Sequence, residues 1–222
     1  MTWKNLFTSS IGKKLLMGAT GLFLILFLIV HASINSMIFY DDGGVTFNKA
    51  AYFMSRNFLM RILEAGLFAF FILHIIQGLR LWRKNHTARQ VGYERQKFPS
   101  NIKWYSRYMG WLGTFLLLFL IMHLSHFWIG TKSEMYFNGS EKNLYLEMKE
   151  VFTNPFLFAL YMVGLVSLLF HLLHGFQSAF QTLGINHRRW TPIIRAIGIF
   201  YSVAICILFA MMPVSFMAGW LH

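Results

Sequence analysis

The sequence predicts an all-α membrane protein, a bundle of five transmembrane helices whose amino terminus lies in the cytoplasm. Of the 222 residues, 56% are hydrophobic and 18% aromatic, and only 8 are acidic. Five separate apolar runs reach the length of about 20 residues that crosses a bilayer. The net charge of +12 falls between these runs, which favours a membrane topology over nucleic-acid binding. The single Cys206 excludes an intrachain disulfide and an iron–sulfur cluster held by this chain alone.

The five runs define one membrane domain over residues 1–222. The predicted spans are 13–38, 57–83, 104–130, 155–184 and 191–220. Residues 1–12 are expected to lie at the membrane interface, and surface helices are expected at 45–56 and 143–152. Ser9 or Ser10 is the expected cap of the first span, and Asp-Asp-Gly-Gly at 41–44 predicts a turn. The first apolar run continues for about 25 residues, too long for a cleaved signal peptide.

Basic residues alternate between the two sides of the predicted bundle. The amino-terminal segment, the connection 84–103 and the loop 185–190 are rich in Lys and Arg, whereas the first and third connections balance basic with acidic residues. With five spans, all three basic segments fall on the same side of the membrane. The positive-inside rule therefore predicts a cytoplasmic amino terminus and an external carboxy terminus.

Four of the five spans carry a histidine within their apolar run: His31, His74, His123 and His171. An imidazole at this depth is costly and usually marks function. Counting the helical rise from the basic ends places His31 and His123 near the outer side. The same count places His74 and His171 near the inner side. Because haem iron accepts axial imidazoles, two level pairs predict two stacked bis-histidine b haems, roughly 10 Å apart in depth. Zinc is disfavoured, and hydrogen bonding between helices is the alternative.

Two of these histidines share a local pattern. His74 is followed four residues later by Gly78, and His171 by Gly175. Residues four apart lie on one helix face, so each glycine leaves space beside an imidazole for a flat macrocycle. We therefore expect these glycines to belong to the cofactor site.

Two further histidines compete for the ligand positions. His126 lies one turn after His123, and His174 one turn after His171, so each can face the same side as its neighbour. The histidine–glycine pattern favours His171, and the greater depth of His123 favours it over His126. The remaining histidines are expected at the surface: His86, His187 and His222.

Two charged residues within or near the second span have candidate roles. Arg80 lies near the inner edge, where it is able to pair with a haem propionate or simply extend towards water. Glu64 is the only carboxylate within a span. It is a candidate proton donor to a quinone near the outer side, and an ion pair with Arg61 is the alternative.

Five segments together resemble a known family. They are ATGLFLILFLIVHASIN, FNKAAYFMSRNFLMRILE, HIIQGLR, FLIMHLSHFW and FHLLHGFQSAFQTLGI. They are similar to the cytochrome b558-type subunit, with five spans and two haems, of succinate:menaquinone oxidoreductases and quinol:fumarate reductases. The resemblance covers essentially the whole chain.

The resemblance implies a position in an electron-transfer chain. The haem at His74 and His171 would receive electrons from an iron–sulfur subunit on the cytoplasmic side. The haem at His31 and His123 would lie near a menaquinone site. A flavoprotein subunit with FAD would carry the succinate and fumarate chemistry, and the complex would occupy a bacterial inner (cytoplasmic) membrane. Some members have a glutamate two residues before the span-four ligand, where this chain has Leu169, so a proton path of that kind is not implied.

Two other functions compete with this one. The chain could be the membrane cytochrome b of another dehydrogenase, of the hydrogenase or formate dehydrogenase type. It could also be a haem-free transporter or anchor in which the histidines join helices, although no inverted repeat is visible and no glycine–proline pair breaks a span.

Overall fold

The computed structural model describes residues 9–40, 42–87 and 103–221, and within these ranges its regular structure is helical. Five helical segments are long and apolar enough to cross a membrane: Ser10–Phe39, Phe58–Thr87, Met109–Asn138, Pro155–Thr182 and Trp190–Met217. The predicted class, an all-α bundle of five membrane-spanning helices, is confirmed. Residues 1–8 of the predicted interfacial segment 1–12 lie outside the described part.

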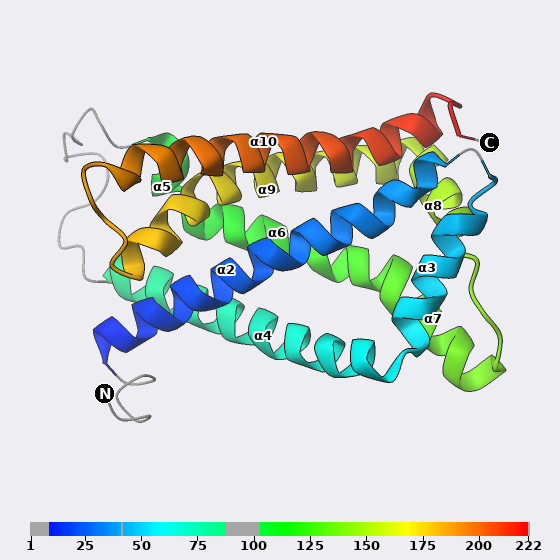
Figure 1. The fold of residues 1–222 in the computed structure, drawn as a ribbon, viewed down its shortest axis with the longest axis horizontal. Coiled ribbons are helices and arrows are strands. Elements are labelled where there is room, and N and C mark those ends of the chain that lie inside the picture. The colour runs from blue at the N-terminus through cyan, green and yellow to red at the C-terminus, as the bar shows by residue number, and fades with distance from the viewer. Residues whose placement is uncertain (1–8, 41, 88–102, 222) are drawn as a thin grey trace.

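The long helices lie side by side along the molecule (Figure 1). Helices α2 (Ser10–Asn35), α6 (Met109–His123) and α10 (Trp190–Met217) run in one direction, and α4 (Phe58–Thr87) and α9 (Pro155–Thr182) run in the other. The start of α2, the end of α4 and the turn from α9 to α10 gather at one end, on the left in Figure 1. We call it the basic end, because it carries Lys13, Lys14, Arg83, Lys84, Arg188 and Arg189. A cytoplasmic position for this end remains a prediction.

Side-chain caps define where two of these helices begin. Ser9 precedes α2, and its Oγ accepts a hydrogen bond from the backbone N–H of Gly12 at 3.0 Å, so Ser9 is the cap. Asn154 precedes α9 and accepts from the backbone N–H groups of residues 156 and 157, with Pro155 at the first helical position. Both arrangements satisfy N–H groups that a helix start leaves free.

The third membrane helix is shifted from the predicted span 104–130. Trp104–Arg107 form a separate turn, α5, and a bend at Tyr108 precedes α6. Beyond His123 the helix continues through η3 (Leu124–Ile129, π-helical), α7 (Gly130–Ser133) and η4 (Glu134–Asn138, π-helical). The helix continues beyond the predicted span end at 130, because Gly130 keeps helical angles, with φ of −58°, and the chain leaves the helix only at Gly139, where φ is +64°.

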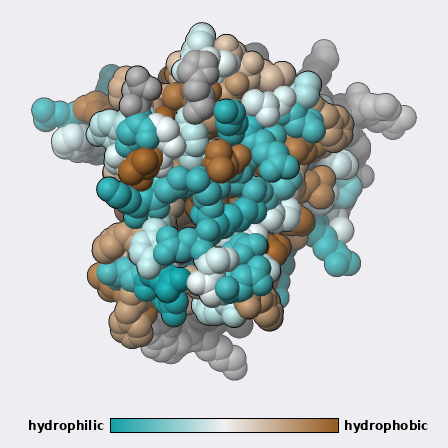
Figure 2. Space-filling model, turned by 90° about the vertical axis from the view of Figure 1, so that its right-hand side faces the viewer, coloured by the Kyte–Doolittle hydropathy of each residue, from teal (hydrophilic) through white to brown (hydrophobic). Residues whose placement is uncertain are grey.

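Two shorter helices close the end opposite the basic end. Helix α3 (Val45–Arg56) follows η1 (Ser36–Phe39), and helix α8 (Leu144–Thr153) precedes α9. The Asn48 side chain joins them, since it donates to Asn143 Oδ1 at 2.9 Å and accepts from the Tyr145 backbone N–H at 3.1 Å. Hydrophilic side chains gather across the middle of this end (Figure 2).

Helix α8 is more than the predicted surface helix. One side of it is buried, through Tyr145, Met148, Val151 and Phe152. These side chains pack with Tyr161 of α9 and Phe216 of α10 in a hydrophobic cluster. A second cluster joins α2, α9 and α10 along the bundle. Helix α4 contributes only Gln77 to the buried residues, so most of its apolar surface is free to contact lipid.

Candidate functional site: two pairs of histidines

The first pair lies towards the end that carries α3 and α8. His31 of α2 and His123, the last residue of α6, have ring centroids 5.7 Å apart and planes 82° apart. Each imidazole stacks on a phenylalanine one turn earlier on its own helix, with centroid distances of 5.4 Å to Phe27 and 5.7 Å to Phe119. The two rings therefore face each other within an aromatic environment. A π-helical turn begins immediately after His123, and such turns are frequent at functional sites.

The second pair lies nearer the basic end. His74 of α4 and His171 of α9 have ring centroids 6.3 Å apart and planes 62° apart. Glycines from the two neighbouring helices flank the rings. A Cβ on Gly21 of α2 would lie 3.5 Å from His74 Cε1, and one on Gly113 of α6 would lie 3.8 Å from His171 Cε1. A side chain longer than a methyl group at either position would enter the space beside the imidazoles.

These contacts measure the separation between the two pairs. Gly21 is level with His74 and lies ten residues before His31 on α2, while Gly113 is level with His171 and lies ten residues before His123 on α6. Ten residues correspond to about 15 Å of helical rise. Both helices give the same separation, which exceeds the 10 Å expected from the sequence. The expectation used the charged ends of the spans as reference points, and those ends are not level with one another.

Thr20 contacts the His74 ring from α2. Its side chain is fully buried, and its Oγ1 lies 2.8 Å from the Leu16 carbonyl, 3.1 Å from the Met17 carbonyl and 3.2 Å from His74 Nδ1. The donor and acceptor roles in the contact between Thr20 and His74 depend on the histidine tautomer. A hydroxyl that donates to the backbone leaves its oxygen to accept from His74 Nδ1–H, and this tautomer keeps the lone pair of Nε2 free for a metal.

His123 and His171, on the other side of each pair, have no such hydrogen-bond partner among the described residues. Nδ1 of His123 and Nδ1 of His171 are buried without a hydrogen bond in the described part of the chain. The Asn35 amide lies 3.4 Å from His31 Nδ1 and donates to the His31 carbonyl at 2.7 Å. Unpaired buried nitrogens are uncommon, so these two rings differ from His74, which has Thr20 beside its Nδ1.

The two competing histidines are engaged elsewhere. Nδ1 of His126 lies 3.0 Å from the Tyr161 hydroxyl. Nδ1 of His174 lies 3.0 Å from Ser106 Oγ, on α5. Among the described residues, neither ring contacts a histidine of another span. This geometry favours His123 and His171 as the paired residues, and their role as ligands stays a prediction.

The donor set fits haem better than a free metal ion. No group of three or more His, Cys, Asp or Glu side chains able to hold a metal occurs in the described residues. Haem iron needs only axial protein ligands. Two imidazoles on opposite sides of one metal, each with a bond of about 2 Å, have ring centres roughly 6 Å apart. The centroid distances of 5.7 and 6.3 Å agree with this value.

The two glycines predicted beside the inner pair are covered by methionines. A Cβ on Gly78 would lie 3.5 Å from Met17 Cε, and one on Gly175 would lie 3.8 Å from Met109 Cε. Methionine side chains are flexible and adapt to neighbouring shapes. The position of a planar ligand at these glycines stays a prediction.

Gln77 is a polar residue that the sequence analysis did not select. It lies one turn after His74, is 2% exposed, and its Oε1 has no hydrogen-bond partner among the described residues. Its amide side chain within an apolar span was the sequence feature that could have indicated a functional position. Arg80, which was selected, is exposed near the basic end, where a role with a haem propionate remains a proposal.

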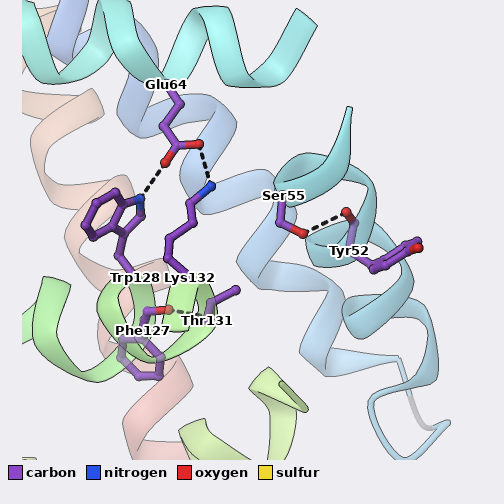
Figure 3. A network of polar contacts seen from close by, with 7 residues as sticks. All are labelled: Tyr52, Ser55, Glu64, Phe127, Trp128, Thr131 and Lys132. Carbon is purple, nitrogen blue, oxygen red and sulfur yellow. Dashed lines mark hydrogen bonds and ion pairs between the residues drawn. The ribbon is translucent and has the colours of Figure 1, made fainter. Parts of the chain in front are cut away.

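Glu64 joins α4 to the third membrane helix (Figure 3). Its Oε2 lies 2.8 Å from Lys132 Nζ, and its Oε1 accepts a hydrogen bond from the indole N–H of Trp128. The expected alternative partner, Arg61, is therefore replaced by Lys132, because the third helix continues past Gly130 and brings this lysine opposite α4. Both carboxylate oxygens are occupied, which favours a role in holding the helices together.

Comparison with known proteins finds one relevant similarity. The chain is 28% identical over 163 residues to the succinate dehydrogenase cytochrome b558 subunit of Bacillus subtilis (strain 168), an alignment that covers 72% of this chain and 73% of the relative. No protein-family model matches the chain. No solved structure matches it either.

Proposed function

We propose that this chain is the membrane-anchor cytochrome b subunit of a succinate dehydrogenase or fumarate reductase, with two bis-histidine b haems. The observation that carries the proposal is the presence of two facing histidine pairs, contributed by four different spans and about 15 Å apart along the bundle. The similarity to the B. subtilis cytochrome b558 subunit supports the choice of complex.

Each part of the chain has a distinct role in this proposal. His74 and His171 hold the haem nearer the basic end, and His31 and His123 hold the other. When bound, the haem irons accept and release single electrons. Phenylalanines around His31 and His123 exclude water from that pair, and Thr20 orients the His74 ring. The helices hold both pairs in fixed positions, so electrons need no moving carrier within the membrane.

The two ends of the bundle serve different partners. The basic end faces the cytoplasm of a bacterium, where it docks an iron–sulfur subunit that is itself attached to an FAD-containing flavoprotein. The opposite end lies near the site where menaquinone is reduced. Glu64, close to that end, supplies or relays a proton only if its ion pair with Lys132 opens.

A purification with spectroscopy tests the choice of complex. We expect a tagged chain, extracted from its native membrane in mild detergent, to retain a flavoprotein and an iron–sulfur subunit. Succinate should reduce its b haems, and a menaquinone analogue should reoxidise them. Hydrogen and formate serve as control donors. Reduction by either of them, without reduction by succinate, would assign the chain to a different dehydrogenase.

A further inference from the structure

A pocket lined by both basic and apolar side chains opens at the basic end between α9 and α10. It has a volume of about 640 Å³, and its lining includes Arg188, Arg195, Thr191 and Asn186. Gln177 of α9 and Ile199 of α10 also line the pocket. The proposed electron transfer through the histidine pairs assigns no role to the residues that line this pocket.

The polar groups of this pocket favour an anion. Among the described residues, Arg188 and Arg195 have no ion-pair or hydrogen-bond partner, and the sequence contains no Asp or Glu after Glu150. The Thr191 hydroxyl donates to Asn186 Oδ1 at 3.1 Å, which leaves the amide N–H groups of Asn186 to act as donors. The pocket therefore offers two guanidinium groups and an amide to a ligand, and its described lining residues include no carboxylate.

The surface beyond the pocket is apolar. Ile199, in the pocket wall, is 42% exposed, and Phe200 and Val203, each one turn after a lining residue of the same helix, are 76% and 40% exposed. From Thr191 to Val203 the helix rises about 18 Å. An anionic headgroup at the arginines would thus continue into acyl chains lying along a membrane-spanning helix, whereas a soluble anion would leave this surface unused.

We propose that this pocket binds the headgroup of an anionic phospholipid, with Arg188 and Arg195 contacting its phosphate. Basic pockets between membrane helices on the cytoplasmic side are suited to such headgroups. The bound lipid fills the space between the start of α10 and the end of α9. The proposal is independent of the haems.

Lipid binding to the purified full-length protein tests this directly. The probes are phosphatidylglycerol and phosphatidylcholine, with retention measured by native mass spectrometry and the midpoint of thermal unfolding measured in nanodiscs of each lipid. We expect the wild-type protein to retain more phosphatidylglycerol than phosphatidylcholine. In the Arg188→Gln/Arg195→Gln double variant, we expect its affinity for phosphatidylglycerol to fall by about tenfold or more.

The matched control removes two charges from the same end but outside the pocket, in Lys13→Gln/Lys14→Gln. Its affinity should fall by less than about twofold. An equal fall in both variants would contradict the proposal, because it would indicate general attraction between a basic end and an anionic surface. Equal retention of both lipids by wild type, or displacement of phosphatidylglycerol by millimolar inorganic phosphate, would also overturn it. Circular dichroism of each variant verifies that the bundle is folded.

Discussion

The His171→Ala variant is expected to contain one b haem per chain where the wild type contains two. Its imidazole faces His74 at a centroid distance of 6.3 Å, so alanine removes one axial ligand from the pair nearer the basic end. The pair formed by His31 and His123 lies about 15 Å away along the bundle and should keep its haem. Electron transfer from succinate to quinone should fall to background. The measurement is a haem assay per polypeptide on the purified variant, with a reduced-minus-oxidised spectrum.

The matched control for this variant is His174→Ala, one helical turn away. The His174 ring contacts Ser106 and has no histidine opposite it among the described residues. We expect this variant to keep both haems. If it loses a haem while His171→Ala keeps both, the ligand assignment is wrong and His174 takes the position.

Thr20→Val is expected to raise the midpoint potential of the haem held by His74 and His171. When Nε2 of His74 binds iron, its Nδ1 carries the hydrogen and donates to the Thr20 oxygen 3.2 Å away. This hydrogen bond increases electron donation from the ring, which favours ferric iron. A hydrogen bond contributes about 1 kcal/mol. For one electron, with 59 mV per tenfold change, this corresponds to a rise of up to roughly 40 mV. A redox titration followed at the haem absorption bands gives the value for each haem.

Two further variants separate this effect from a loss of packing. Thr20→Ser keeps the hydroxyl and should restore a potential close to that of wild type. Thr114→Val removes another hydroxyl that bonds to its own helix, to the Gly110 carbonyl at 3.0 Å, without an observed contact to a histidine. It should leave both potentials unchanged. An unchanged potential in Thr20→Val, with both haems bound, would contradict the role of Thr20 in orienting His74.

The sequence predicts the helices and the levels of the histidines well, since both depend on local properties. Apolar length identifies five helices, and counting the rise from the basic segments places His31 with His123 and His74 with His171. The structure brings the same residues together as ring pairs. Their role as haem ligands stays a prediction.

The differences arise where contacts between helices decide the outcome. The third span was expected to end near residue 130, but the helix continues through Gly130, since a single glycine inside a long helix is tolerated at a small cost. The buried side of α8 depends on the position of Tyr161 and Phe216, which its own ten residues do not reveal. In the same way, the contact of Thr20 with His74 depends on the rotation of α2 relative to α4, and no local pattern encodes that rotation.

The central claim is that two histidine pairs each hold one haem. The most direct measurement is the haem content of the purified wild-type chain, determined by a pyridine haemochrome assay and combined with electron paramagnetic resonance of the oxidised protein. If each histidine pair holds one haem, we expect two b haems per chain, both with low-spin, bis-imidazole signals. A well-folded preparation without haem, obtained from cells supplied with haem precursor, would contradict the account and return the four histidines to contacts between helices.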